Sequence, residues 1–375
     1  MRKRRLSIRQ LKRLPKDGAS RHENLSSQPH VPQPVFNNPE VLTQGWYPVC
    51  AARALRTAEA RSFKILHQRL VVFRTATGQL CAMDAFCPHL GADLGNGRVV
   101  GERIQCYFHQ WELSTQGQLA RIPCREHLEP GFQKVKNRTY PVVERYGHIW
   151  VFSAEEALHD LPQPSHLKGV PLTARWVQEI RLFAHHHVMM CNGIDLQHFA
   201  SVHNLDIAFD YEVKASESGV FEWTLKGEIP TNTFKARLAR ALLGDTYEYH
   251  VKFAGGSVVT ISYGVDQYLG PFKLPSLQIL WGCLPQPSGV SRARIFFLSP
   301  AYRGLLGPFR VWGVYVLTLL MLLMLRDEDL FAFPNMRFNA HQLIKEDRSL
   351  GRFIQLTNQL ALSDWGKLPT SEEPS

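Results

Sequence analysis

The chain has 375 residues, 45% of them hydrophobic, which is enough for two ordinary domains with apolar cores. A chain that is disordered throughout is therefore excluded. The net charge of +10 is concentrated at one end, because residues 1–17 hold eight Lys/Arg and a single acid and leave about +3 for the remainder. The charge is thus no evidence for nucleic-acid binding, and no nucleic-acid partner is expected.

The first 40 residues are expected to form a basic, disordered N-terminal segment. Its first part interleaves Lys/Arg with leucines and Ile8, a pattern that also allows a short amphipathic helix on anionic lipid or an organelle transit peptide. Residues 18–40 are rich in Pro, Ser and Asn, as linkers are. The seven cysteines suggest no disulfide framework and no secretory pattern is present, so we expect a cytoplasmic protein, with membrane association left open.

Residues 41–155 are expected to form a small all-β domain, with folded structure beginning near Trp46. Lys64 to Thr75 alternates apolar and polar residues, Thr77-Gly78 predicts a turn, and Leu80 to Asp84 returns. A second strand pair is expected within Arg138 to Phe152. The short spacing of these runs is typical of a small sandwich.

Residues 156–375 are expected to form a second domain, in which long strands and a closing helix make an antiparallel sheet that grips a helix. This gives an α+β fold class for the whole chain. The predicted strands are Arg175 to Met190, Phe209 to Ile229, Tyr247 to Tyr268 and Leu277 to Leu298. The predicted helices are Asn192 to His203 and Leu305 to Asp329, with further helix after Asn339.

The most hydrophobic stretch is Val311 to Leu325, with 15 residues. Because roughly 20 residues are needed to span a bilayer, a buried core helix is the first expectation. A helix that dips into a membrane surface is the alternative.

Two short motifs bring cysteine and histidine together in the first domain. They are Cys87-Pro-His89 and Cys106-Tyr-Phe-His109, separated by 16 residues. Two thiolates and two imidazoles can hold a [2Fe–2S] cluster, with cysteines on one iron and histidines on the other. A structural zinc site is the alternative, but such sites usually have wider Cys-Cys and His-His spacings. The other five cysteines lack such partners and are interpreted as small buried residues.

The segment that holds these motifs, CPHLGADLGNGRVVGERIQCYFHQW, resembles the Rieske motif, and the likeness extends from Trp46 to Phe152. The resemblance implies that Cys87 and Cys106 bind one iron and that His89 and His109 bind the other. It also implies that Trp111 packs beneath the second loop. The sequence departs from the usual pattern at Gln110, where glycine is common, and this affects loop geometry more than ligation.

A second motif, DxxHxxxxH, lies at Asp195, His198 and His203, and it resembles the mononuclear iron motif of Rieske non-heme iron oxygenases. Two imidazoles and one carboxylate on one face of Fe(II) leave the other positions open for dioxygen. On an ideal helix His198 and His203 lie about 140° apart, so both can face one metal only if the helix ends or distorts between them. Ordinary helix surface is the alternative for this motif taken alone.

The resemblance implies a third iron ligand and a bridge between subunits, and residue spacing adds two expectations, a hydrogen bond from Asp195 and the placement of three histidines. The third iron ligand is expected at Asp329, with Asp327 as the fallback, in a segment that matches the family pattern. Asp195 is expected to hydrogen-bond a ligand imidazole and to bridge to a cluster histidine of a neighbouring subunit, which implies a homo-oligomer, expected to be a trimer. His185, His186 and His187 are expected to alternate on a strand, as core or pocket lining rather than as ligands.

The chain as a whole is therefore similar to Rieske oxygenases, over roughly residues 44–340, and most similar to the branch with aminopyrrolnitrin oxygenase and the steroid ring monooxygenases. This implies a helix-grip catalytic domain and monooxygenation of a hydrophobic small molecule, with dioxygen as co-substrate. No dinucleotide or plant-type ferredoxin motif is present, so electrons from NAD(P)H are expected through a separate ferredoxin or flavin reductase. A Rieske electron carrier and a non-catalytic helix-grip ligand-binding protein are the alternatives. Residues such as Phe199, Trp281 and Phe331 are candidates for an apolar pocket.

Overall fold

The computed structural model describes residues 34–182, 184–203, 207–231, 237, 240, 245–269, 271–286, 290–332, 338–339 and 342–366; for residues 269 and 324–332 it describes the backbone alone. The basic stretch within residues 1–33 lies outside these ranges.

Short antiparallel strands make up the first part of the chain, as the alternating pattern predicts. Three small sheets have the strand orders β10-β5-β4-β3, β11-β12-β2 and β6-β7-β8-β9. Their bounds are β2 (Trp46–Ala51), β3 (Glu59–Ile65), β4 (Gln68–Arg74), β5 (Leu80–Asp84), β6 (Arg98–Val100), β7 (Arg103–Gln105), β8 (Glu112–Ser114), β9 (Leu119–Arg121), β10 (Thr139–Tyr140), β11 (Val142–Arg145) and β12 (His148–Phe152).

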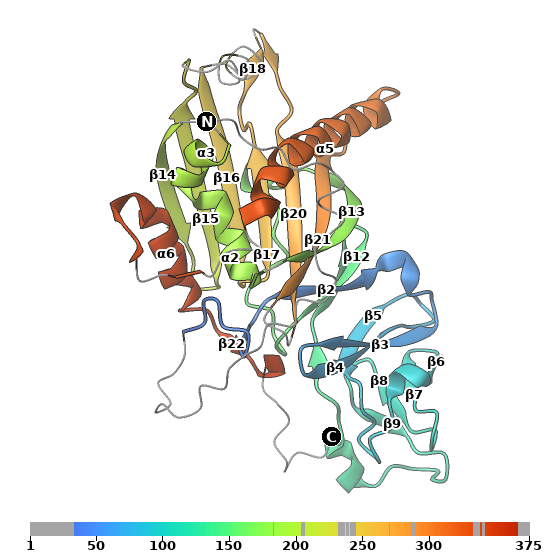
Figure 1. Cartoon of the computed structure of the whole chain (residues 1–375). Helices are drawn as coiled ribbons and strands as arrows, with labels where there is room; N and C mark the ends of the chain where they lie inside the picture. The colour runs from blue at the N-terminus through green and yellow to red at the C-terminus, as the bar shows by residue number, and fades with distance from the viewer. Residues whose placement is uncertain are drawn as a thin grey trace, which may run out of the picture. The chain divides into compact units, whose positions relative to one another are not determined.

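A larger antiparallel sheet follows, with the strand order β13-β21-β20-β17-β16-β15-β14 among the described residues (Figure 1). Its strands are β13 (Leu172–Leu182), β14 (Ala208–Ala215), β15 (Val220–Glu228), β16 (Thr246–Ala254), β17 (Val258–Tyr263), β20 (Leu277–Pro285) and β21 (Ser291–Pro300). A small hairpin, β18 (Tyr268–Leu269) and β19 (Phe272–Lys273), interrupts it. Together with the all-β first part, this sheet and its helices confirm the α+β class.

Three of the long predicted strands are in fact hairpins. The prediction of single strands over Phe209 to Ile229, Tyr247 to Tyr268 and Leu277 to Leu298 was wrong, because each range contains a reversal of the chain. Gly219 has φ +80° and Gly255 has φ +58°, so glycine supplies the left-handed conformation that the first two turns need.

The helices of the second part are α2 (His186–Cys191), α3 (Leu196–Ser201), α5 (Gly307–Ala332) and α6 (Arg348–Thr357). The expected helix from Asn192 to His203 is shorter than predicted, since a 3-10 turn at Asn192–Ile194 separates α2 from α3. None of the described helices is long and apolar enough to pass through a membrane.

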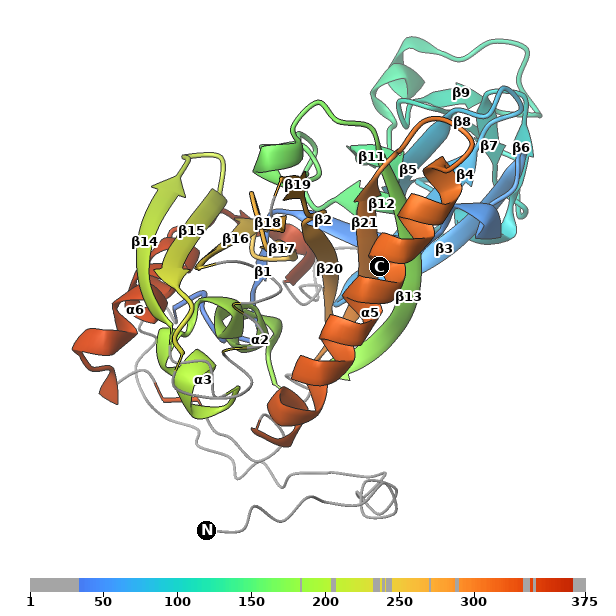
Figure 2. The same ribbon diagram turned by 90° about the horizontal axis from the view of Figure 1, so that it is seen from above.

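The two faces of the large sheet have different partners. Residues of alternating parity on one strand point to opposite faces. Ile279 and Cys283 face the helices, whereas Leu280 packs against Trp150 of β12 in the first part. Figure 2 shows the sheet curving around the side on which α2 and α5 lie.

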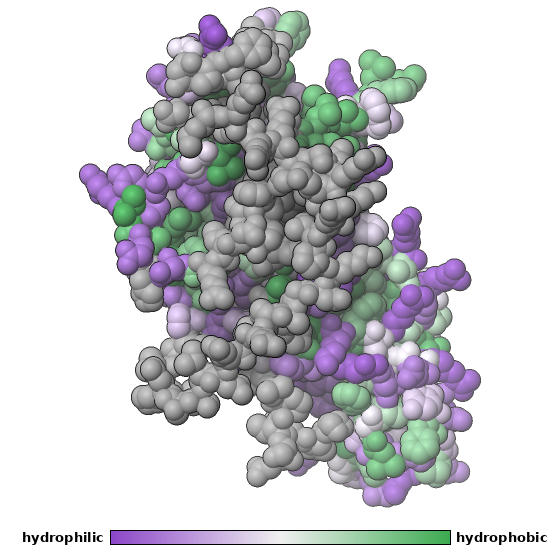
Figure 3. All heavy atoms as spheres, viewed as in Figure 1, coloured by the Kyte–Doolittle hydropathy of each residue, from purple (hydrophilic) through white to green (hydrophobic). Residues whose placement is uncertain are grey.

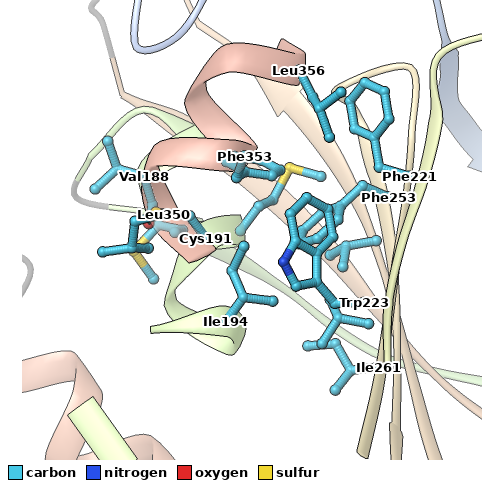
Figure 4. Close-up of a cluster of buried hydrophobic side chains, with 14 of the residues drawn as sticks. Val188, Cys191, Ile194, Phe221, Trp223, Phe253, Ile261, Leu350, Phe353 and Leu356 are labelled. Carbon is cyan, nitrogen blue, oxygen red and sulfur yellow. The ribbon is translucent and has the colours of Figure 1, made fainter. Parts of the chain in front are cut away.

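The main apolar core lies between the helices and the centre of the sheet (Figure 4). It joins Trp223, Phe253 and Ile261 from the strands with Cys191 from α2 and Phe353 from α6. Burial of such side chains contributes roughly 1.5–3 kcal/mol each. The core therefore fixes α2, and with it the segment that carries the second motif.

Both ends of the described chain pack into the fold, and the first does so earlier in the sequence than expected. Phe36 is buried against Phe353 and His187, so folded structure begins before Trp46 and within the segment that was expected to be disordered. Near the other end, β22 (Leu362–Ser363) pairs with β1 (Leu42–Thr43), and Trp365 packs on Tyr140.

Candidate metal centres

Two loops of matching geometry carry the first Cys/His set. In one, the N–H of Gly91 donates to the carbonyl of Cys87 and the N–H of Cys87 donates to Ala92, both at 2.9 Å. In the other, Gln110 donates to the carbonyl of Cys106 at 3.1 Å and Cys106 donates to Trp111 at 2.8 Å. Each cysteine is thus held at the start of a closed turn that returns its histidine toward the same point.

The second loop places Gln110 at φ +57°, in the left-handed region that glycine adopts at least cost. Gly91 has φ +72° at the matching position of the first loop. The departure from the common glycine is therefore accommodated with the same backbone turn, and the ligand positions are kept.

The four expected cluster ligands lie together. Cys87 and Cys106 are buried at 3% and 2% exposure, and their thiols interact directly. The rings of His89 and His109 lie 4.6 Å apart, and Trp111 stacks on His89 at 4.3 Å. The expectation placed Trp111 beneath the second loop; it in fact supports the histidine of the first.

The chemistry of this donor set fits an iron–sulfur cluster. Burial, together with the nearby Cys106, raises the pKa of the Cys87 thiol to about 11. Two buried thiolates therefore need a cation between them. The Nδ1 atom of His89 is buried without a hydrogen-bond partner among the described residues, so it is free to bind a metal.

The second motif lies where α3 ends. The side chain of Asp195 caps α3 by accepting the N–H of His198 at 3.2 Å. The helix ends at Ser201, before His203, and the rings of His198 and His203 lie 4.4 Å apart. The requirement that the helix end between the two histidines is therefore met, and both can face one metal.

Asp195 has a role in the local fold that the sequence did not predict. The structure gives its carboxylate a bond to the backbone N–H of His198, so the residue acts first as a helix cap. Burial raises the pKa of Asp195, although the His198 N–H and the His198 charge act in the opposite direction. A half-buried carboxylate beside two imidazoles can accept a further proton or hydrogen bond.

Asn192 is a neighbour of this site that the sequence analysis missed. Its Nδ2 lies 3.5 Å from Nε2 of His198. The signal was available, since Asn192, Asp195 and His198 recur at three-residue intervals before the helix end. The expected third ligand, Asp329, and its fallback Asp327 belong to the last part of α5, where side chains lie outside those described.

His185, His186 and His187 do not alternate on a strand, so that expectation was wrong. They lie at the start of α2, all buried, with ligand nitrogens within 4.8 Å of one another. The reason is local: Nδ1 of His185 accepts the N–H of His187 and starts the helix. All three are buried, as core or pocket-lining residues are.

The hydrogen bonds of this cluster argue against a metal there. Nδ1 of His185 accepts from His187, and Nδ1 of His187 accepts the N–H of Asn37 at 3.3 Å. A neutral imidazole whose Nδ1 accepts must carry its proton on Nε2, which then has no lone pair for a metal. Burial lowers the pKa of His185 to about 4 and those of His186 and His187 well below their ordinary values, so all three stay neutral near pH 7.

Comparison with known proteins agrees with a Rieske domain in the first part of the chain. Residues 45–141 match the family model of the Rieske [2Fe-2S] domain. The chain is 33% identical to cholesterol 7-desaturase nvd of Bombyx mori over 46% of this chain and 38% of that protein. It is 29% identical to aminopyrrolnitrin oxygenase PrnD of Pseudomonas fluorescens over 65% of this chain and 62% of that one. The aligned regions thus span less than two thirds of these relatives.

Solved structures extend the likeness to the fold of the second part. Dicamba monooxygenase bound to dicamba superposes with a TM-score of 0.55 at 18% identity, over 87% of this chain and 98% of that chain. NdmB of Pseudomonas putida CBB5 gives a TM-score of 0.59 at 15% identity, over 87% and 93%. The first part of the chain is a Rieske domain, and the described chain has the fold of these oxygenases, as the sequence resemblance implied.

Proposed function

We propose that this chain, a relative of Rieske oxygenases in sequence and fold, is an oxygenase component that uses dioxygen to oxidise a hydrophobic molecule. The observation that carries the proposal is the pairing of His198 and His203 at 4.4 Å beyond the end of α3, in a chain that also has a Rieske domain. An electron carrier needs no such pair. A non-catalytic ligand-binding protein needs neither the pair nor the Cys/His loops.

The first centre would hold a [2Fe–2S] cluster, with Cys87 and Cys106 on one iron and His89 and His109 on the other. The cluster supplies a one-electron store. The chain around it excludes water from the cysteines, and Trp111 fixes the ring plane of His89 by stacking. The proposed boundaries of this domain are 41–155, supported by β12 ending at Phe152.

The second centre would hold Fe(II) through His198, His203 and Asp329, within a proposed catalytic domain of residues 156–375. A 2-His-1-carboxylate site keeps positions open for dioxygen and substrate. The net reaction for a monooxygenation takes dioxygen, two electrons and two protons, inserts one oxygen atom into substrate and releases one water. We propose that electrons from NAD(P)H arrive through a separate ferredoxin or flavin reductase.

Asp195 is proposed as the link between the two kinds of centre. Its carboxylate is half-buried, caps α3 and lies beside His198, so it can hold that segment and accept a bond from a cluster histidine of a neighbouring subunit. The tip of the Rieske domain supports such a contact, because Leu90, Tyr107 and Phe108 are exposed there. A homotrimer is the proposed assembly.

The substrate is proposed to lie on the side of the large sheet that faces the helices. Phe199 is buried and packs near His203, Phe209 and Tyr249. Trp281 shares this face, and its indole N–H is buried without an acceptor among the described residues. An apolar molecule with one oxygen atom would suit these side chains. The backbone of Phe331 belongs to α5, and its side chain is outside those described.

The test of the proposal is the metal content and turnover of matched variants. We expect three irons and two acid-labile sulfides per chain in anaerobically purified protein. His198→Ala should keep the visible spectrum of the cluster and lose one iron and product formation, whereas the exposed His127→Ala should change neither. Product formation by His198→Ala at the wild-type rate would contradict the assignment.

The role of Asp195 has a separate test. Asp195→Ala should retain three irons but slow the electron transfer that follows mixing of the reduced protein with dioxygen and substrate. Single-turnover rates equal to those of the wild type would refute the bridging role.

A further inference from the structure

Helix α5 and the two leucines just before it carry exposed apolar side chains. We call these residues the outer face of α5. Leu305 and Phe309 are 96% and 72% exposed, and Trp312 is 61% exposed. The full set is Leu305, Leu306, Phe309, Trp312, Leu317, Leu319, Leu320 and Leu323. In Figure 3, hydrophobic residues lie at the upper right, where Figure 1 places one end of α5.

The opposite side of α5 is also apolar and is already covered. Val314, Tyr315 and Thr318 are buried, and Tyr315 packs with Ile279 and Phe297 of the sheet. A helix that is apolar on all sides is normally enclosed on all sides. With a rise of 1.5 Å per residue, the helical part of the outer face, from Phe309 to Leu323, extends about 21 Å. This is too large a continuous apolar strip to be ordinary surface.

In the sequence, the charged residues within and just before this strip are positive, whereas Asp327, Glu328 and Asp329 follow its last residue, Leu323. From Val290 to Arg326 the sequence contains no acidic residue. Arg303 and Arg310 are exposed beside Leu305, Phe309 and Trp312, and no ion pair joins either arginine to the described residues. Aromatic and leucine side chains flanked by arginine are the composition of helices that lie in a membrane interface. Arginine there reaches the anionic headgroups while its stem stays apolar.

We propose that the outer face of α5 docks on an anionic membrane surface, with the helix lying parallel to the bilayer and Phe309 and Trp312 inserted below the headgroups. A two-fold contact with a second copy fits less well, because it would bring Arg303 and Arg310 of both copies together; the proposed trimer joins different faces of the chain and does not need this one. The inference rests on the proposed function in one respect: the oxygenase would bind its hydrophobic substrate at the membrane, into which such a molecule partitions.

The test is flotation of the full chain with vesicles of equal parts phosphatidylcholine and phosphatidylglycerol. The wild type should float with these vesicles, and Phe309→Ser/Trp312→Ser should lower the partition coefficient about tenfold or more. Arg303→Gln/Arg310→Gln should weaken binding to these vesicles but not to phosphatidylcholine alone. Tyr268→Ser/Phe272→Ser, in the equally exposed β18–β19 hairpin, should bind as the wild type does.

A second measurement locates the contact. The chain has eight tryptophans. Lipids with acyl chains brominated near the headgroup should quench part of the wild-type tryptophan fluorescence, and this quenching should be absent in Trp312→Phe. Equal quenching in the two proteins would overturn the proposal. Unchanged flotation of Phe309→Ser/Trp312→Ser would also overturn it, since binding would then reside elsewhere, for example in the basic residues 1–17. The proposal would also be overturned if this variant lost a self-associated form in sedimentation without vesicles while its flotation stayed unchanged. The outer face would then be a contact between copies of the chain.

Turnover is not measured in these experiments, and the visible spectrum of the cluster reports that each variant is folded. Failure of the membrane contact therefore leaves the oxygenase proposal standing. Conversely, flotation by a chain that lacks product formation would leave the membrane contact standing.

Discussion

The pH dependence of stability should reveal the buried His185. Burial lowers the pKa of this imidazole from 6.5 to about 4. Between these two values the unfolded chain therefore binds a proton that the folded chain does not. The stability that the neutral, buried imidazole contributes is fully present above pH 6.5 and is lost as the pH falls toward 4. The whole difference corresponds to about 3 kcal/mol, of which about 2 kcal/mol falls between pH 7 and pH 5.

The variant His185→Asn isolates this effect. The Oδ1 atom of asparagine can accept the N–H of His187 as Nδ1 of His185 does, so the start of α2 keeps its cap while the titrating group is removed. The midpoint of urea unfolding, followed by circular dichroism from pH 7 to pH 5, should fall less steeply in this variant. The difference between the two proteins should change by about 2 kcal/mol over that range.

The control is His127→Asn, which removes an exposed imidazole and should leave the pH dependence as it is. Curves for wild type and His185→Asn that fall in parallel would refute the reasoning. Iron content should be equal in the wild type and His185→Asn, because the hydrogen bonds of His185 and His187 argue against a metal there. A loss of iron in His185→Asn would contradict that assignment.

Three further changes follow from the packing. Gly282→Ala would place a Cβ 2.5 Å from Cη2 of Trp150, so it should destabilise the protein by about 1–3 kcal/mol in urea unfolding, whereas Gly313→Ala, which meets nothing within 4 Å, should not. Gln110→Gly should keep the cluster spectrum and change stability by less than about 1 kcal/mol, because φ +57° suits glycine; loss of the spectrum would mean that the side chain supports the loop. Phe36→Ala should cost about 3–5 kcal/mol by leaving a cavity between α6 and His187, and an unchanged unfolding midpoint would mean that residues near Phe36 detach from the fold.

The sequence by itself determined the parts of this protein that depend on short spacings. The Cys87-x-His89 and Cys106-x-x-His109 motifs lie in tight turns whose hydrogen bonds close within five residues, so few backbone arrangements are available to them. The geometry of DxxHxxxxH likewise required α3 to end before His203, and it does. The alternating residues of the first part predicted its short strands for the same reason.

Only the tertiary structure decided what depends on distant partners. Apolar alternation runs through Phe209 to Ile229 without marking Gly219 as a reversal, because both arms of the hairpin pack on the same core. The histidines at 185–187 look like a strand in the sequence, but a local bond from the N–H of His187 to His185 starts a helix there. Ser291 and Asn37, far away in the chain, supply further hydrogen bonds to them.

The two faces of α5 show the same division most clearly. Sequence composition makes them alike, since both are apolar. Strands β13, β21 and β20 of the sheet cover one face of α5 and leave the other exposed, because a sheet can cover only one side of a helix. Hydrophobicity is a property of the residues, whereas exposure is a property of what the fold brings to lie over them.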